Sequence, residues 1–414
     1  MAAAISRDDA LALDAEDPIA AFRDRFVLPR DLIYLDGNSL GPPPKSVQQR
    51  VGEVMAREWG EDLIGGWTKH GWIDLPGRIA DAIAPLIGAS QGEVVVADST
   101  SVNLFKLLAA ALRLRSDRPV ILSERDNFPT DLYIAEGLVG LLGGGASLRL
   151  VDRADLADGL GPDVAVVMLT HVDFRTGAMH DMAARTAAAH ECGALVLWDL
   201  SHSAGAVPVE LDRHQVDLAV GCGYKYLNGG PGAPAFAFAA RRHHQELRSP
   251  LSGWMGHASP FDFDVDYRPA PGVDRLLAGT PPILSLAALE CGVESIAAIG
   301  MDLLRAKSVA LTELFIALVE GRCADFGIEI VSPREAALRG SQVSLRHPGG
   351  YAVMQALIAA GVVGDFRHPD LLRFGFAPAY VRFVDVWDAV ERLREILDSA
   401  AWDRAEYRLR GKVT

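Results

Sequence analysis

A lysine, an acid and a histidine fall at the ends of apolar runs in the middle of this chain. Asp199 and His202 follow the run 194–198, and Lys225 follows the run 218–221. Ligands of parallel sheets bind at the edge where the carboxyl ends of the strands meet, so we expect these side chains to converge there. A lone lysine at such a place is usually a solvated loop residue. A partly buried lysine can instead be uncharged and form a Schiff base with an aldehyde cofactor.

The surroundings of Lys225 favour the second interpretation. The lysine stands in the stretch Gly-Tyr-Lys-Tyr-Leu-Asn-Gly-Gly-Pro-Gly, whose glycines permit a bulky ligand to approach the backbone closely. Asp199, one strand away, supplies a carboxylate that can keep the ring nitrogen of pyridoxal phosphate protonated, which makes the ring an electron sink. The two residues together predict pyridoxal phosphate chemistry.

The pattern around these residues predicts the fold that positions them. Short apolar runs alternate with longer helical patterns such as Ser101–Leu114 and Asp181–Cys192, the second of which opens on an acidic cap and is followed by Gly193. Such alternation is typical of an α/β fold with a mainly parallel sheet sandwiched by helices. The expected strands are Val94–Ala97, Val120–Ser123, Leu148–Val151, Val164–Thr170, Ala194–Asp199, Leu218–Gly221 and Ala235–Ala239.

We expect three parts along the chain. Residues 1–75 form an N-terminal segment of helix and loop, and residues 76–290 form the large α/β domain that binds the cofactor. Residues 291–414 form a smaller α+β domain. In that domain we expect a long helix, the strands Ile328–Val331, Val343–Arg346 and Leu371–Phe376, and a final helix Asp385–Leu397.

Composition excludes several classes of protein. The 414 residues are 50% hydrophobic and 23% charged, which excludes a small disulfide scaffold and a disordered chain. A formal net charge of -14 repels a phosphate backbone, so nucleic acid is not an expected partner. The four cysteines show no zinc spacing, so we expect no metal and a reduced, cytoplasmic protein.

Targeting and nucleotide motifs are not found either. The first residues lack the cationic start and apolar core of a signal peptide, and no apolar run reaches the roughly 18 to 20 residues that a membrane helix needs. We therefore expect a soluble protein without a membrane partner. No GxGxxG opens a helix directly after a strand, which argues against a nucleotide dehydrogenase.

Five segments, in this order along the chain, resemble the kynureninases, which are fold type I pyridoxal phosphate enzymes of the aminotransferase class V group. The segments are Tyr34–Gly41 (YLDGNSLG), Phe128–Asp131 (FPTD), Tyr224–Gly230 (YKYLNGG), Pro281–Ile283 (PPI) and Leu372–Pro378 (LRFGFAP). The resemblance covers nearly the whole chain. It implies hydrolytic cleavage of the Cβ–Cγ bond of L-kynurenine to anthranilate and L-alanine, in the kynurenine pathway of tryptophan catabolism and NAD biosynthesis, with pyridoxal 5'-phosphate as the cofactor.

The resemblance also implies roles for individual residues. Lys225 bonds to the cofactor, Asp199 pairs with its ring nitrogen, and Tyr224 exchanges protons at the substrate carbonyl and at the departing β-carbon. For that task the pKa of Tyr224, ordinarily about 10, is expected to fall, and the cofactor phosphate as a nearby proton partner is one route to this. Further cofactor contacts are expected from Thr100, Ser101, Phe128, Pro129, Thr130, Asp131, Thr170, His202, Trp254 and Thr280. The expected substrate contacts are Trp67, Asn38 and Arg373, the last as a bidentate clamp of the α-carboxylate or, alternatively, in an ordinary salt bridge.

The stretch that holds Trp254 and Thr280 comes from the neighbouring subunit in this family, which implies a homodimer with shared active sites. The alternative is an ordinary buried tryptophan in a loop. Ser101 is expected at the start of a helix, either as a plain cap or also at the phosphate. Gly223 departs from the family pattern, since relatives often carry a hydroxyl residue at this position. The hydrogen bond that such a hydroxyl would give to the cofactor phosphate is therefore not expected from residue 223. The resemblance also places Trp67 and Thr280 beside the aryl group of the substrate, and an indole there predicts a preference for L-kynurenine over 3-hydroxykynurenine. The alternative is that both are packing or turn residues.

Two other functions stay open. A cysteine desulfurase needs a reactive thiol in the C-terminal domain, and no cysteine follows Cys323. A non-catalytic binding protein that keeps the cofactor fold would turn over no amino acid, and it would carry an appended effector domain for which this length leaves no room.

Overall fold

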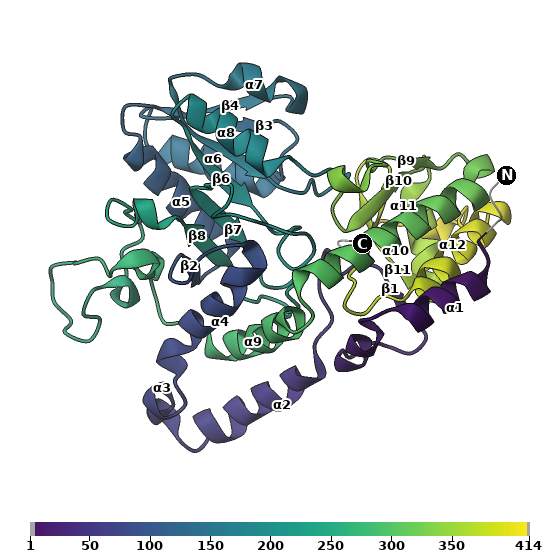
Figure 1. Ribbon diagram of the computed structural model, residues 1–414, viewed down its shortest axis with the longest axis horizontal. Coiled ribbons are helices and arrows are strands. Elements are labelled where there is room, and N and C mark those ends of the chain that lie inside the picture. The colour runs from purple at the N-terminus through teal and green to yellow at the C-terminus, as the bar shows by residue number, and fades with distance from the viewer. Residues whose placement is uncertain (1–4, 412–414) are drawn as a thin grey trace.

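Seven strands form the sheet of the larger lobe in the computed structural model, which describes residues 5–411 (Figure 1). Their order is β2-β8-β7-β6-β5-β3-β4; β3 to β7 run parallel, and β8 is antiparallel to both of its neighbours. The expected mainly parallel sheet is therefore confirmed. The strands are β2 (Val94–Val96), β3 (Val120–Glu124), β4 (Ser147–Val151), β5 (Val164–Thr170), β6 (Leu195–Asp199), β7 (Leu218–Gly221) and β8 (Phe236–Ala239).

Helices cover both faces of this sheet, and β6 shows why its sequence is continuously apolar. Leu195 and Leu197 pack with Leu104 of α5 (Thr100–Leu114) in one core. Trp198 points to the opposite face, where it donates a 3.3 Å hydrogen bond to Thr186 of α8 (Met182–Glu191). A strand that is buried on both faces carries apolar side chains along its length, so its polar functional side chain, Asp199, comes at its end.

The smaller lobe holds an antiparallel sheet of order β12-β13-β10-β9. Its strands are β9 (Glu329–Ile330), β10 (Gln342–Arg346), β12 (Asp365–Arg367) and β13 (Leu371–Gly375). The helix α11 (Gly350–Ala359) packs against the sheet, and α12 (Phe383–Asp398) packs against α11. Neither β12 nor α11 was expected. The long helix expected after residue 290 is two helices, α9 (Ile283–Ala297) and α10 (Met301–Arg322), bent by 79° at a break that contains Gly300 in the left-handed region, with φ of 86°.

The N-terminal residues lie on the smaller lobe. Figure 1 shows α1 (Arg7–Glu16) beside α12, and β1 (Ile33–Tyr34) pairs in parallel with β11 (Val362–Val363). The chain then forms an arm of α2 (Lys45–Glu53) and α3 (Gly66–Lys69), and α4 (Leu75–Ile83) packs against α9 in the larger lobe. The segment 1–75 thus packs on the smaller lobe and then leads to the larger one. The domain limits at 75 and 290 stay predictions.

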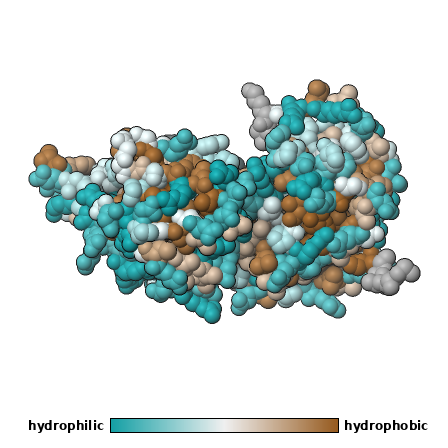
Figure 2. All heavy atoms as spheres, turned by 90° about the horizontal axis from the view of Figure 1, so that it is seen from above, coloured by the Kyte–Doolittle hydropathy of each residue, from teal (hydrophilic) through white to brown (hydrophobic). Residues whose placement is uncertain are grey.

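Within residues 5–411 no single helix is long and apolar enough to cross a membrane; α9 and α10 meet that length and composition only as a bent pair. The face shown in Figure 2 is mostly hydrophilic, with hydrophobic residues gathered in patches on both lobes.

Candidate active site

The register of the parallel strands brings the expected residues to one edge of the sheet. Thr170 at the end of β5 is the register partner of Asp199 at the end of β6, and β7 leads into the loop of Lys225. A pocket of about 220 Å³ opens there. Its lining is Thr100, Ser101, Phe128, Thr130, Asp131, Thr170, Phe174, Asp199, Ser201, His202, Tyr224 and Lys225. The sequence had not singled out Phe174 and Ser201, although both follow strand ends that it marked.

Two buried carboxyl groups, those of Asp131 and Asp199, line this pocket. Asp199 is 3% exposed and accepts a 2.7 Å hydrogen bond from the backbone N–H of Ser201. Burial raises the pKa of Asp131 well above its ordinary value, and the charge of Asp199 raises it further; Thr170 donates a 3.3 Å hydrogen bond to the same group. Burial also raises the pKa of Asp199. Two such acids favour a positively charged group beside them, as a protonated ring nitrogen is.

The amine of Lys225 lies among a histidine and aromatic rings. Its Nζ is 2.9 Å from Nε2 of His202, 5.9 Å from the ring centroid of Phe128 and 5.8 Å from that of Tyr224. Burial, followed by the charge of Lys225, lowers the pKa of His202 well below its ordinary value, so this ring is neutral. The amine therefore has a neutral acceptor at hydrogen-bond distance.

The beginning of α5 fits a phosphate group. Free backbone N–H groups and the helix dipole favour an anion at a helix N-terminus. The cap is Ser99, whose hydroxyl accepts a 3.3 Å hydrogen bond from the N–H of Val102, so the cap role considered for Ser101 is wrong. The hydroxyl of Thr100 is buried without a hydrogen-bond partner among the described residues. An orphaned hydroxyl at this place, with Lys225 and Asp199 in the same pocket, fits pyridoxal phosphate.

Tyr224 and Gly223 precede the lysine. Burial, with Cys222 and Asp199 nearby, raises the pKa of Tyr224, so the protein's own groups do not lower it, and the lowering by the cofactor phosphate stays a prediction. The phenol keeps its proton at neutral pH and can donate it. A Cβ at Gly223 would collide with the carbonyl oxygen of Pro234, so this backbone has no room for the hydroxyl residue that the resemblance implies.

Arg373 and Asn38 lie outside the pocket lining. Arg373 is buried and donates from Nε to Asp365 at 2.7 Å, from Nη2 to Ser39 at 2.8 Å and from Nη1 to the carbonyl oxygen of Phe174 at 2.7 Å. The guanidinium that was expected to bind the substrate carboxylate is thus already paired with the carboxylate of Asp365. Asn38 is fully buried beside this cluster, and neither atom of its amide has a partner among the described residues.

The remaining predicted residues lie elsewhere in the chain. Pro129 opens α6 (Pro129–Leu141), between two residues that line the pocket. Trp254 is 36% exposed and Thr280 is exposed as well. Both belong to the segment between β8 and α9, part of which projects from the larger lobe (Figure 1). Trp67 packs edge-on against Trp72 at 5.9 Å, in a cluster with Ile283. None of these four lines the pocket within one chain.

Comparison with known proteins decides the family. A model of the kynureninase C-terminal domain matches residues 304–393, and the model of class V aminotransferases matches residues 78–347. The chain is 55% identical to kynureninase from Burkholderia pseudomallei (strain 1106a), over 99% of this chain and 100% of that one. It belongs to the kynureninase family. Kynureninase from Pseudomonas fluorescens is 54% identical over the same shares, and the cofactor of this family is pyridoxal 5'-phosphate.

Solved structures with low sequence identity share the fold. A cysteine desulfurase from Escherichia coli superposes with a TM-score of 0.77 at 19% identity, over 92% of this chain and 98% of that one. A second, from Thermococcus onnurineus, gives 0.76 at 20% identity over the same shares. These neighbours confirm a fold type I architecture. The desulfurase alternative is not favoured, because Cys323 is completely buried and burial raises the pKa of its thiol to about 11.

Proposed function

We propose that Lys225, Asp199 and Tyr224 carry out the reaction of this family, the hydrolysis of L-kynurenine to anthranilate and L-alanine. The observation that carries the assignment is the meeting of Lys225 and Asp199 in one buried pocket at the carboxyl edge of the sheet. Pyridoxal phosphate supplies an aldehyde that bonds to the substrate amine and a ring that accepts electrons. The substrate is a breakdown product of tryptophan, so we place the reaction in tryptophan catabolism.

Each of the three residues has a defined task. Lys225 takes the proton from the α-carbon of the substrate and returns it, because its amine is the base that projects into the pocket. The carboxylate of Asp199 holds the proton on the ring nitrogen. Thr100 and Ser101 line the pocket and, with the first N–H groups of α5, would bind the phosphate; Phe128, also in the lining, would contact the ring.

Tyr224 acts at the carbonyl group of the substrate. Its phenol donates a proton to the γ-carbonyl oxygen as water adds to the carbonyl carbon. The phenolate that results takes back a proton from the added water. The Cβ–Cγ bond then breaks and leaves its electron pair on Cβ, Tyr224 gives its proton to Cβ, which becomes the methyl group of alanine, and Cγ leaves as the carboxyl group of anthranilate. The proton that the second oxygen on Cγ loses restores the phenol. The raised pKa of the phenol suits the donor role, because the group is protonated before the reaction begins.

We further propose that two copies of the chain share their active sites. Trp254 lies on a loop whose aromatic side chains are widely exposed: Phe261 by 63% and Phe263 by 76%. Next to the arm, an apolar hollow of about 390 Å³ is lined by residues that include Trp59 and Ile283. Exposed apolar surface of this kind is typical of subunit interfaces. Because Trp254 and Thr280 miss the pocket of their own chain, we assign them to the pocket of the partner.

The four cysteines are free thiols, which supports a reducing compartment, and we place the protein in the cytoplasm.

One assay tests the function. The protein, loaded with pyridoxal phosphate, is given L-kynurenine or L-cysteine in separate reactions, and the products are quantified. We expect anthranilate and L-alanine in equal amounts from L-kynurenine, and no catalytic release of sulfur from L-cysteine. Sulfur release without anthranilate would establish the desulfurase instead, and no product from either substrate would favour the non-catalytic binding protein.

A further inference from the structure

Gln342, the first residue of β10, connects the smaller lobe to the active site. Its side chain is fully buried. The amide nitrogen donates to the carbonyl oxygens of Phe174 at 3.2 Å and Asp173 at 3.3 Å, and the amide oxygen lies 3.0 Å from Nδ1 of His202. The opposite nitrogen of that histidine is the one that faces Lys225.

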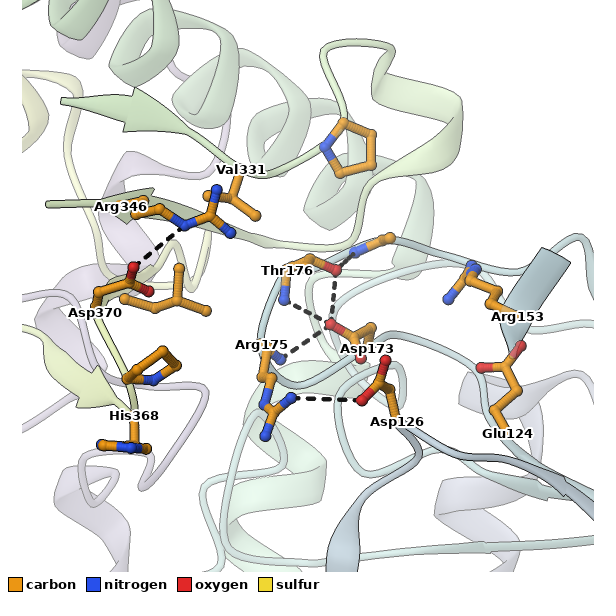
Figure 3. Close-up of a pocket in the computed structure, with 14 residues that line it drawn as sticks. Glu124, Asp126, Arg153, Asp173, Arg175, Thr176, Val331, Arg346, His368 and Asp370 are labelled. Atoms are coloured by element: carbon orange, nitrogen blue, oxygen red, sulfur yellow. Dashed lines mark hydrogen bonds and ion pairs between the residues drawn. The ribbon is translucent and has the colours of Figure 1, made fainter. Parts of the chain in front are cut away.

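The two carbonyl groups are held in place by the loop to which they belong. The carboxylate of Asp173 accepts hydrogen bonds from the backbone N–H groups of Arg175 at 3.1 Å and Thr176 at 2.6 Å, which closes a tight turn (Figure 3). This turn borders a cleft of about 490 Å³ between the lobes. The carbonyl oxygen of Phe174 also accepts the 2.7 Å hydrogen bond from Arg373. Two fixed acceptors therefore face the amide of Gln342.

Fixed acceptors determine which way the amide of Gln342 points. A carbonyl oxygen has no proton to give, so the group that faces Phe174 and Asp173 must be the amide NH₂. The amide oxygen then faces His202, and since that oxygen only accepts, Nδ1 of His202 must carry a proton. In a neutral imidazole the other nitrogen, Nε2, has a lone pair. That lone pair is directed at Nζ of Lys225.

We propose that Gln342 is a positioning residue of the active site: it holds His202 as the Nδ1–H tautomer, so that Nε2 accepts a hydrogen bond from the lysine amine. The proposal rests on the assignment of Lys225 as the reactive amine. Charged groups around His202 agree with a neutral ring, because Lys225, Arg373 and Arg367 all oppose a second proton on it. The placement of the smaller lobe thereby determines which nitrogen of a histidine in the larger lobe carries the proton.

The tautomer can be measured directly by ¹⁵N NMR of the full chain labelled in histidine, with and without pyridoxal phosphate. The signal of His202 is identified by its loss in His202→Asn. We expect a protonated Nδ1 and an unprotonated Nε2 at neutral pH in the wild type. A protonated Nε2, or a doubly protonated ring, would overturn the proposal, and this measurement does not depend on the folding of any variant at position 342.

Variants of Gln342 test its part in this arrangement. Gln342→Leu removes both polar ends at similar size, so we expect the ¹⁵N signals of His202 to shift toward a mixture of tautomers and kcat to fall about tenfold. In Gln342→Glu a carboxylate faces Nδ1, and we expect a doubly protonated ring. Gln91→Leu, at an exposed position, is the matched control. An unchanged His202 in Gln342→Leu would refute the proposal, whereas full turnover by Lys225→Ala would refute the assigned function and leave the tautomer result standing.

Discussion

The backbone N–H of Ser201 donates a 2.7 Å hydrogen bond to the carboxylate of Asp199, so the loop after β6 fixes the acid that faces the cofactor site. An asparagine can accept the same bond, and Asp199→Asn should therefore keep the shape of the pocket. It cannot hold a proton on the ring nitrogen, so we expect kcat to fall about a hundredfold or more. Cofactor occupancy should fall far less. Both are measured at saturating pyridoxal phosphate, and equal activity in the variant would show that this acid is structural.

Trp254→Phe should weaken cofactor retention in the assembled dimer, because it removes an indole N–H donor with little change in volume. Retention is measured by dialysis, and the oligomeric state by light scattering. Wild-type protein that is fully active as a monomer would refute the shared site.

Complementation gives a second test of the shared site. In the proposed pocket Lys225 comes from one subunit and Trp254 from the other, so Lys225→Ala and Trp254→Ala each remove a different subunit's contribution. If the pocket is shared, mixed dimers contain one intact site, so remixing the two variants should restore about a quarter of wild-type activity. A mixture that never exceeds the sum of the separate variants would mean that Trp254 and Lys225 of one chain serve the same pocket, which contradicts the shared site.

Trp67 and Thr280 are proposed to border the aryl group of the substrate, and they predict a preference for L-kynurenine over 3-hydroxykynurenine. An indole offers no partner for an added ring hydroxyl, and an unpaired buried hydroxyl costs about 1 to 3 kcal/mol, or roughly five- to more than a hundredfold in kcat/KM. The double variant Trp67→His with Thr280→Asn should shift the ratio toward the hydroxylated substrate. A wild-type preference for 3-hydroxykynurenine would contradict this account, as would an equal loss on both substrates in the double variant.

Asp217 predicts how the stability of the larger lobe depends on pH. Burial alone would raise its pKa, but hydrogen bonds from His190, His243 and the N–H of Val196 outweigh burial and hold it far below its ordinary value. A depressed pKa stabilises the fold above the unfolded value of about 4, and this contribution is lost as pH falls below it. Asp217→Asn should therefore lower the free energy of unfolding by about 3 kcal/mol near neutral pH and little in strong acid.

Urea unfolding of the wild type and Asp217→Asn, at neutral pH and in strong acid, measures the difference in the free energy of unfolding. Asp163→Asn removes an exposed carboxylate that pairs with Arg149 and is the matched control, for which little change is expected at either pH. If Asp217→Asn loses as much stability in acid as at neutral pH, the charge of the Asp217 carboxylate does not stabilise the fold, and the loss comes from packing or hydrogen-bond geometry.

The larger lobe could be predicted because its signals are local. Apolar runs bounded by polar residues mark each strand, and parallel strands place their ends together, so Thr170, Asp199 and Lys225 converge. Phe174 was missed because it lies in the loop after a strand end, where no periodicity identifies the residue that turns inward.

The smaller lobe was predicted less completely because its contacts are distant in sequence. Ile33 pairs with Val362, more than three hundred residues away. In β12, Asp365 and Arg367 flank a single apolar residue, which is typical of a loop; Asp365 is buried only because Arg373 on the neighbouring strand pairs with it. Gln342 likewise looks like an ordinary polar residue until its three partners are in place.

The central claim is that Lys225 is the residue that bonds to the cofactor and moves the substrate proton. Replacing it with alanine should abolish turnover and leave the fold intact, since its contribution is chemical; Lys69→Ala, at an exposed lysine, is the control.

The most direct measurement is borohydride reduction of the protein loaded with pyridoxal phosphate, followed by mass spectrometry of its peptides. We predict one cofactor mass, on the peptide that contains Lys225, and none in Lys225→Ala. Cofactor found on another lysine, or turnover at the wild-type rate by Lys225→Ala, would contradict the account.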